Sequence, residues 1–279
     1  MRIGLFGAGK MGTALACGLT NAFREIELRV VEPNDSAWEA FKKAVGERAT
    51  LDRVGAEASW IDEVEVIILS VKPQQINAVL REIGKLRTDK LVISVAAGIR
   101  LSAVESALGD RARCVRVMPN TPLLIGEGFS AYALSCRCLK SDETFVTTLF
   151  NSPPRIAAGI GSKAVRVEEH LMDAITALSG SGPAYVFHFI HALIEGGKKL
   201  GLEEALARDA AMWTVAGALA MMRGQPQRSP MDLAGDVKSP NGTTEAAYRF
   251  LEQHQWEEIL IRAMKAAEMR SRELSGEGK

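Results

Sequence analysis

The first twelve residues constrain the fold of this chain more than any other stretch. Residues 2–6 form a short apolar run typical of a buried strand, and it is followed directly by Gly7-Ala8-Gly9-Lys10-Met11-Gly12. The next residues, 13–19, predict a helix. A G-x-G-x-x-G turn between a strand and a helix is the arrangement that binds the pyrophosphate of a dinucleotide.

Each glycine of this turn has its own physical role. Gly7 permits the sharp turn, Gly9 leaves room for the pyrophosphate, and Gly12 lets the helix lie against the strand. The start of the helix adds free N–H groups and the positive end of the helix dipole. We therefore predict that the whole stretch from Gly7 to Gly12 binds NADH or NADPH, with Ala8, Lys10 and Met11 contributing their backbone.

A second strand, predicted over residues 27–32, ends in Glu32, about 20 residues after the last glycine. A carboxylate at this position accepts hydrogen bonds from ribose hydroxyls and repels a 2′-phosphate. Residues 33–36 contain no arginine or lysine, although Asn34 and Ser36 are able to donate hydrogen bonds to a phosphate. The sequence therefore favours NADH slightly over NADPH.

Strands and helices alternate through the first half of the chain. Further strands are predicted at residues 64–71, 91–95 and 114–118, and Ser36 and Ser102 are expected to cap helices. This alternation indicates an α/β fold with a doubly wound parallel sheet of the Rossmann type. Ligands bind beyond the carboxyl ends of such strands. The further nucleotide contacts predicted there are Ser70, Val71, Lys72, Pro73, Ala97, Gly98 and Asn120.

The second half of the chain has only helical periodicity. We expect a dinucleotide-binding domain over residues 1–163 and an all-helical substrate-binding and dimerisation domain over residues 164–279. Two of the predicted helices, 184–194 and 210–222, are apolar nearly all round, which requires burial on every side. A helical domain of about 115 residues does not bury two such helices by itself. A partner subunit is therefore expected to cover them.

Composition excludes several other classes of protein. Acidic and basic residues balance at 34 each, so neither nucleic acid nor an anionic membrane is expected as a partner. The longest apolar stretch, residues 210–222, is shorter than the roughly 20 residues that span a bilayer. No signal peptide is visible, and the four cysteines lack metal-binding spacing, which favours reduced thiols in a cytoplasmic protein. His188, His191 and Glu195 share a helix face, but core histidines rather than a metal site are expected.

A second informative stretch covers residues 237–244 and runs into a predicted helix. Ser239-Pro240-Asn241-Gly242 ends one helix, and Thr243-Thr244 begins the next with exposed N–H groups. Such a helix start binds anions, and the threonine hydroxyls add donors. The same residues are also compatible with a plain capped helix start, and the sequence leaves the two interpretations open.

The chain as a whole resembles the pyrroline-5-carboxylate reductase family, which catalyses the last step of proline biosynthesis. The resemblance is carried, in the family's order, by residues 7–12, 70–74, 117–122, 177–185 and 237–244. It implies hydride transfer from NAD(P)H to the C=N bond of a small cyclic imino acid in a homodimer with interlocked helical domains. Matched by position, Ser239, Gly242, Thr243 and Thr244 are expected to bind the substrate carboxylate. No side-chain general acid is evident, so either Thr244, as the catalytic residue, or a bound water is expected to supply or orient the imine proton.

Three positions depart from the family's pattern. Asn241 replaces the first glycine of the usual Ser-Pro-Gly-Gly, Ala234-Gly235 stands where a basic–acidic pair is common, and Glu57 stands where an asparagine is frequent. Two alternatives therefore stay open beside the reductase. One is a reductase of another cyclic imino acid, and the other is a non-catalytic protein that senses a nucleotide with the same fold.

Overall fold

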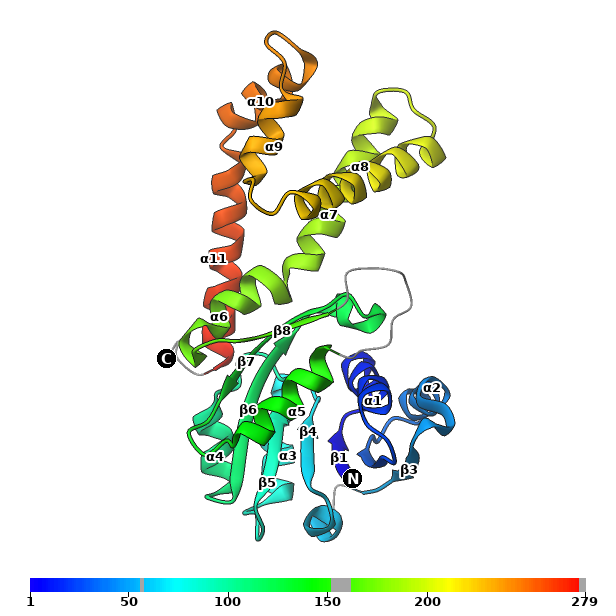
Figure 1. Ribbon diagram of the computed structural model, residues 1–279, viewed down its shortest axis with the longest axis vertical. Helices are drawn as coiled ribbons and strands as arrows, with labels where there is room; N and C mark the ends of the chain where they lie inside the picture. Colours follow the sequence, from blue (N-terminus) through cyan, green and yellow to red (C-terminus); the bar gives the residue numbers. More distant parts are fainter. Residues whose placement is uncertain (56–57, 152–161, 276–279) are drawn as a thin grey trace. The chain divides into compact units, whose positions relative to one another are not determined.

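The computed structural model describes residues 1–55, 58–151 and 162–275 (Figure 1). By its packing the chain divides into two compact units. Unit 1 comprises Met1–Ser181 together with Ala267–Lys279, and unit 2 comprises Gly182–Ala266. The division by role that the sequence suggests, between residues 163 and 164, stays a prediction.

Unit 1 is built on an eight-stranded sheet with the order β3-β2-β1-β4-β5-β6-β7-β8. Its strands are β1 (Arg2–Phe6), β2 (Glu27–Val31), β3 (Thr50–Arg53), β4 (Val66–Leu69), β5 (Lys90–Ser94), β6 (Ala112–Pro119), β7 (Phe129–Leu134) and β8 (Lys163–Arg166). All neighbours run parallel except β6 and β7, which are antiparallel. The strand order reverses between β1 and β4, and ligands of open α/β sheets bind beyond the strand ends at such a point.

Helices cover both faces of this sheet (Figure 1). They are α1 (Lys10–Ala22), α2 (Asp35–Val45), α3 (Ile76–Ile83), α4 (Leu101–Leu108), α5 (Lys140–Asn151) and the short α6 (Met172–Ile175). Side chains of α1, α2 and α5 share one core with Ile3 and Leu5 of β1, whereas α3 and α4 share the opposite core with Phe6. Phe6 stacks there on Trp60, with ring centroids 5.5 Å apart. The doubly wound prediction is confirmed.

Two predicted helix caps are wrong. Asn34, not Ser36, caps α2, because its Oδ1 accepts a hydrogen bond from the Ala37 N–H at 2.9 Å. The first N–H of α4, on Leu101, donates to Oε1 of Glu169 at 2.7 Å, so a residue far away in sequence replaces the predicted cap at Ser102. Four elements, β3, β7, β8 and α5, have no counterpart among the predicted strands and helices.

Unit 2 is helical, as predicted. It contains α7 (Gly182–Lys199), α8 (Glu204–Gly224), α9 (Pro230–Val237), α10 (Thr243–Gln253) and most of α11 (Trp256–Leu274), whose last turns belong to unit 1. The start of α9 shows why these ends are well defined. Ser229 accepts from the Asp232 N–H, Asp232 accepts from the Ser229 N–H, and Pro230 occupies the first turn.

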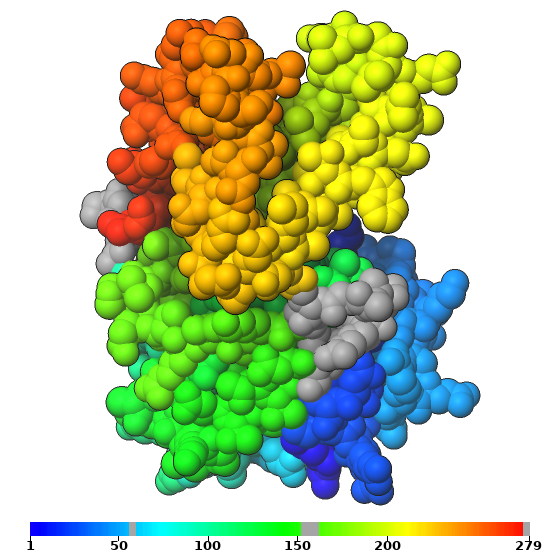
Figure 2. Space-filling view, turned by 45° about the horizontal axis from the view of Figure 1, so that its top comes forward, coloured from blue at the N-terminus to red at the C-terminus, as the bar shows by residue number. Residues whose placement is uncertain are grey.

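The helices of unit 2 expose large apolar side chains in the single chain. Phe187 on α7 is 67% exposed and Trp213 on α8 is 79% exposed. Among the described residues of unit 2, the buried apolar side chains are Ala207, Ala211 and Leu233. Figure 2 shows the surface of α8, α9 and α10 in yellow to orange. An apolar surface of this kind marks a protein interface, which supports the predicted partner subunit. No helix that the structure describes is long and apolar enough to cross a bilayer.

Candidate active site

The glycine turn follows β1 directly and is held in place by its neighbours. Gly7 has a φ of +94°, which favours glycine, and its N–H donates to the Val31 carbonyl at 2.9 Å. A Cβ on Gly12 would overlap the Gly7 carbonyl oxygen and lie 2.7 Å from Oγ of Ser70. Gly7 and Gly12 are therefore required by the turn itself, before any ligand is considered.

Gly9 differs from the other two glycines because no atom of the residues that the structure describes lies within 4 Å of the position its Cβ would take. It is the N-cap of α1, which has no side-chain cap and no acidic residue in its first turn. Gly9 and Lys10 at this helix start are both exposed. This arrangement fits the pyrophosphate of a dinucleotide, which binds where a glycine admits it to a helix N-terminus.

Glu32 follows β2 and ties the glycine turn to the next loop. Its Oε2 accepts from the Ala8 N–H at 2.9 Å, and its Oε1 accepts from the Asn34 N–H at 2.9 Å. Each carboxylate oxygen has a second lone pair available. The carboxylate is therefore held at the end of β2, where it is expected to bind ribose hydroxyls.

Ser70 stands at the carboxyl end of β4 and holds the same turn. Its hydroxyl donates to the Gly7 carbonyl at 2.6 Å and also lies 3.0 Å from the Phe6 carbonyl. Val71 packs near Gly7 as well, exposed Lys72 follows, and Pro73 begins the helical turn that leads into α3. The structure thus brings Ser70 and Val71 beside the glycine turn and gives Ser70 a structural role there, while nucleotide contact by Lys72 and Pro73 stays a prediction.

Gly98 and Asn120 both make contacts that sequence reasoning did not predict. Gly98 has a φ of +73°, and a Cβ there would lie 2.7 Å from Cβ of Leu274 in α11. Asn120 accepts from the Phe129 N–H at 2.9 Å and donates to Oγ of Ser179 at 3.3 Å. Both residues, with Ala97, lie after the carboxyl ends of β5 and β6, so nucleotide contact there stays a prediction.

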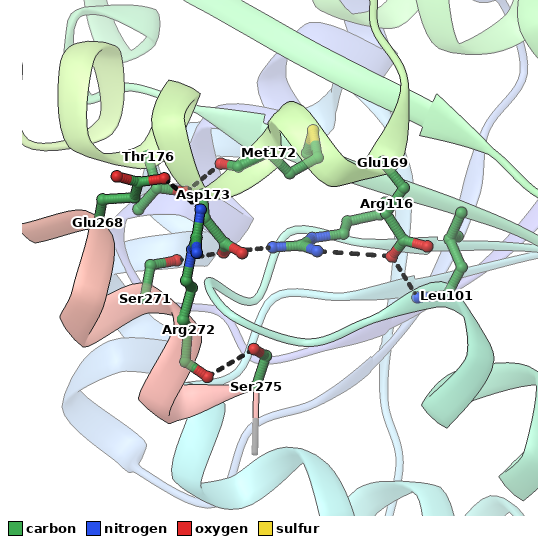
Figure 3. Close-up of polar contacts among 10 residues, drawn as sticks. All are labelled: Leu101, Arg116, Glu169, Met172, Asp173, Thr176, Glu268, Ser271, Arg272 and Ser275. Carbon is green, nitrogen blue, oxygen red and sulfur yellow. Dashed lines mark hydrogen bonds and ion pairs between the residues drawn. The ribbon is translucent and has the colours of Figure 1, made fainter. Parts of the chain in front are cut away.

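Figure 3 shows a buried ionic network that includes Ser271. A Cβ on Gly98 would lie 3.0 Å from the carbonyl oxygen of this serine, so the network lies next to the loop that contains Gly98. Arg116 of β6 is 3% exposed, and its guanidinium lies 3.4 Å from a carboxylate oxygen of Glu169 and 3.4 Å from one of Asp173. Ser271 of α11 donates to Asp173 at 2.6 Å. The network joins the sheet, α4, α6 and the end of α11. Sequence reasoning missed it, although an arginine inside an apolar strand is a signal that a buried partner exists.

The predicted substrate residues lie together at the start of α10 in unit 2. Gly242 is the N-cap, and no side chain in the described part of the chain caps this helix. A Cβ on Gly242 would overlap Oγ of Ser239, so glycine allows these two residues to approach closely. Ala246 donates the first intrahelical hydrogen bond, to the Gly242 carbonyl. The capped-start interpretation is therefore not supported, and Thr243 and Thr244 present their N–H groups and hydroxyls at an uncapped helix end.

Asn241 and Glu245, which lie beside this helix start, are stabilised by contacts with each other. Asn241 adopts φ +58°, a left-handed conformation that asparagine tolerates better than most residues. Its N–H donates to Oε2 of Glu245 at 2.7 Å, and this bond, with help from Arg249, lowers the pKa of the Glu245 carboxyl. The carboxylate is thereby held by the Asn241 backbone. Of the other two departures, Ala234-Gly235 lies inside α9, and Glu57 lies outside the described residues.

Residues considered for other chemistry are placed differently. His188 and His191 on α7 are exposed in the single chain. The expectation of core histidines is therefore wrong for one copy, because this face of α7 is not covered by other described parts of the same chain. Within residues 1–55, 58–151 and 162–275, no group of three or more His, Cys, Asp or Glu side chains is placed to hold a metal ion. All four cysteines are free, and burial raises the pKa of the Cys114 thiol to about 12, which makes it an unreactive core residue.

Three features together define a dinucleotide-binding unit of the Rossmann class of oxidoreductases. They are the order of the strands in the sheet, the glycine turn after β1 and Glu32 at the end of β2. Comparison with known families agrees with this class and extends it to unit 2. A family model for pyrroline-5-carboxylate reductase dimerisation matches residues 169–274. A model described as NADP oxidoreductase, coenzyme F420-dependent, matches residues 2–98.

Individual relatives match nearly the whole chain. Pyrroline-5-carboxylate reductase of Arabidopsis thaliana is 36% identical over 98% of this chain and 95% of its own length. The enzyme of that name from Pseudomonas aeruginosa is 34% identical over 98% of this chain and 97% of its own. The chain therefore belongs to the pyrroline-5-carboxylate reductase family.

Solved structures of the family have the same fold. The Plasmodium falciparum pyrroline carboxylate reductase with NADP bound superposes with a TM-score of 0.82 at 29% identity, covering 99% of this chain and 98% of that one. The Streptococcus pyogenes 1-pyrroline-5-carboxylate reductase gives a TM-score of 0.84 at 26% identity, covering 98% of each chain. The match of a dimerisation model to residues 169–274 also supports self-association as a homodimer.

Proposed function

We propose that this chain reduces 1-pyrroline-5-carboxylate to L-proline with NADH or NADPH. The observation that carries the proposal is the uncapped start of α10, formed by Ser239, Gly242, Thr243 and Thr244 in a chain that belongs to this family. A helix start without a cap offers N–H donors to a small carboxylate. A second anion site, for the pyrophosphate of the nucleotide, is proposed at exposed Gly9, and the absence of a side-chain cap at the start of α1 supports it.

The reaction adds a hydride to the carbon of the C=N bond and a proton to its nitrogen. When bound, the nicotinamide nucleotide supplies the hydride. The residues of α10 bind and orient the imino acid: the N–H groups of Thr243 and Thr244 donate hydrogen bonds to its carboxylate, and the Thr244 hydroxyl donates to that carboxylate or to the imine nitrogen. A protonated imine is the better hydride acceptor, so Thr244 or a water that it orients assists by directing the proton.

Most of the catalytic effect is expected to come from positioning. Reacting atoms held about 3–3.5 Å apart react as if they were one molecule, which removes much of the entropic barrier. Because α7 and α8 expose apolar side chains that a second copy covers, we propose an obligate dimer in which each active site takes residues from both copies. Within this proposal NADH is slightly preferred, since the Glu32 carboxylate at the end of β2 repels a 2′-phosphate.

Turnover decides between the enzyme and the alternatives. Oxidation of NADH and NADPH is measured with pyrroline-5-carboxylate and with a panel of other cyclic imino acids of different ring size and double-bond position. The proposal requires pyrroline-5-carboxylate to give the highest kcat/KM. A higher value with another cyclic imine would assign that substrate instead, and nucleotide binding without any turnover would favour the sensing protein.

Thr244→Val tests the role of the hydroxyl with little change of shape. A hydrogen bond to a charged group contributes on the order of 1.5–3 kcal/mol, so kcat/KM for the imino acid should fall roughly ten- to a hundredfold. Nucleotide affinity, measured by fluorescence titration, should be unchanged. Thr144→Val is the matched control, since Thr144 is an exposed threonine on α5 whose hydroxyl bonds the Lys140 carbonyl. Native kinetics in Thr244→Val would leave the residue a purely structural role.

A further inference from the structure

One arginine holds the loop between β2 and α2 from outside. Arg53 is the last residue of β3, the edge strand that runs parallel beside β2. Its Nε donates to the Glu32 carbonyl at 2.9 Å, and its Nη2 donates to the Pro33 carbonyl at 3.1 Å. Its Nη1 donates to Oδ1 of Asp35 at 2.7 Å. A single guanidinium therefore contacts both ends of the loop that follows Glu32.

The same loop is bonded to the glycine turn from the other side. The Glu32 carboxylate accepts N–H bonds from Ala8 and from Asn34, so its position depends on both segments. In Rossmann-type units the acid at this point faces the ribose that carries the 2′ group, and an arginine nearby accommodates a 2′-phosphate. Residues 33–36 contain no arginine, but Arg53 of the neighbouring strand β3 lies at this place in the fold.

The partners of Arg53 decide whether its charge is available. The side chain is 31% exposed, whereas that of Asp35 is 88% exposed. A guanidinium has five N–H donors in a fixed fork, of which three are used here. Asp35 neutralises the charge of the guanidinium. Together with Glu32 it also places negative charge near the ribose, and this charge repels a 2′-phosphate. A 2′-hydroxyl, being neutral, meets no such repulsion.

We propose that the Arg53–Asp35 ion pair is the specificity-determining element for the nucleotide. With Asp35 present, the guanidinium is bound within the protein and the loop favours the unphosphorylated ribose of NADH. Without the carboxylate of Asp35, the Nη1 donors of Arg53 turn to a 2′-phosphate, and NADPH is bound better. This inference rests on the proposed nucleotide-dependent function and adds the residues that set its cofactor choice.

The test is Asp35→Asn in the full chain, with Kd for NADH and NADPH measured by fluorescence titration in the absence of any imino acid. The Kd for NADPH should fall about tenfold, because one charge-assisted hydrogen bond is gained, while the Kd for NADH should stay within about twofold. Asp52→Asn is the matched control. It removes the same charge from the neighbouring residue of β3, whose side chain points to the opposite face of the strand, and should leave the ratio of the two Kd values unchanged.

A double-mutant cycle shows whether Arg53 carries the gain. In Asp35→Asn/Arg53→Met the improvement for NADPH should disappear, and thermal unfolding establishes that the variant is folded. Arg53→Lys serves as a second variant, since it keeps the charge and loses the fork that bonds two carbonyls. In the Asp35→Asn background it should retain less than half of the NADPH gain.

Three outcomes overturn the inference. The first is a ratio of the Kd values for NADPH and NADH that is the same in Asp35→Asn as in Asp52→Asn. The others are an improvement in NADPH affinity that survives Arg53→Met, or one that is fully retained with Arg53→Lys. These results are separate from the fate of the proposed function. A chain that shows the switch in binding but does not reduce any cyclic imine would retain this inference and lose the catalytic proposal. A chain that binds neither nucleotide would refute both.

Discussion

Alanine at Gly9 and at Gly12 should have opposite consequences, although both glycines belong to one turn. Within the described part of the chain, a Cβ on Gly9 would meet no atom within 4 Å, and the backbone angles there, φ −67° and ψ −172°, are open to alanine. A Cβ on Gly12 overlaps the Gly7 carbonyl oxygen and lies 2.7 Å from Oγ of Ser70. The first substitution should affect only a ligand, and the second should affect the fold.

The magnitudes follow from these contacts. Gly12→Ala overpacks a buried helix against backbone, which costs about 1–3 kcal/mol. For a domain of 150–250 residues this corresponds to a fall in Tm of about 2–12 °C. Gly9→Ala loses a modest N-cap preference and gains from a less flexible unfolded chain, so its stability should change by less than about 1 kcal/mol.

Two measurements separate the variants. Thermal unfolding reports the fold, and fluorescence titration with NADH reports the nucleotide site. Gly9→Ala should melt close to the parent protein and bind NADH at least about tenfold more weakly, because its methyl group occupies the path of the pyrophosphate. Gly12→Ala should melt lower. Native NADH affinity in Gly9→Ala would show that the pyrophosphate does not pass over this glycine, and a native Tm in Gly12→Ala would contradict the packing of α1 on the turn.

Three more substitutions test the buried network and the dimer. Arg116→Met leaves the Glu169 and Asp173 carboxylates without their cation and should cost about 3–5 kcal/mol in the free energy of unfolding, measured with urea; a loss below about 1 kcal/mol would mean that the network contributes little. Met212→Glu and Leu219→Glu place a charge on α8 at side chains that are 48% and 50% exposed in one copy. Each should convert the dimer to a monomer in sedimentation analysis, and an active particle of unchanged mass would refute the interlocked arrangement.

The parts of the fold that the sequence predicts are those that depend on contacts between residues close together in the chain. The strand, turn and helix of residues 2–19 depend on contacts among near neighbours, so glycine positions and apolar runs were sufficient to place them. The helices of unit 2 end at Gly and Pro or begin at capping residues such as Ser229. The partner subunit is also predictable from the sequence, because α7 and α8 are apolar nearly all round and a helix of this kind must be buried on every side.

Features with distant partners could not be predicted in this way. Asp173 accepts a hydrogen bond from Ser271, 98 residues away, and Arg116 reaches Asp173 across 57 residues. Arg53 lies 21 residues after the Glu32 carbonyl that it contacts, on a four-residue strand that periodicity did not reveal. Residues 33–36 contain no arginine or lysine, as the sequence shows, but β3 brings a cation to this loop from a neighbouring strand.

The substitution at Asn241 shows how backbone geometry limits what a departure from the family's pattern means. The two consecutive positions that the family usually fills with glycine make different demands here. Position 241 needs a left-handed backbone, with φ at +58°, and asparagine supplies it. Position 242 has an ordinary φ of −84°, but any Cβ there would overlap Oγ of Ser239. The chain thus replaces the glycine that another residue can mimic and keeps the one required by close approach. The substitution leaves the start of α10 intact, and with it the N–H groups on which the proposed carboxylate site depends.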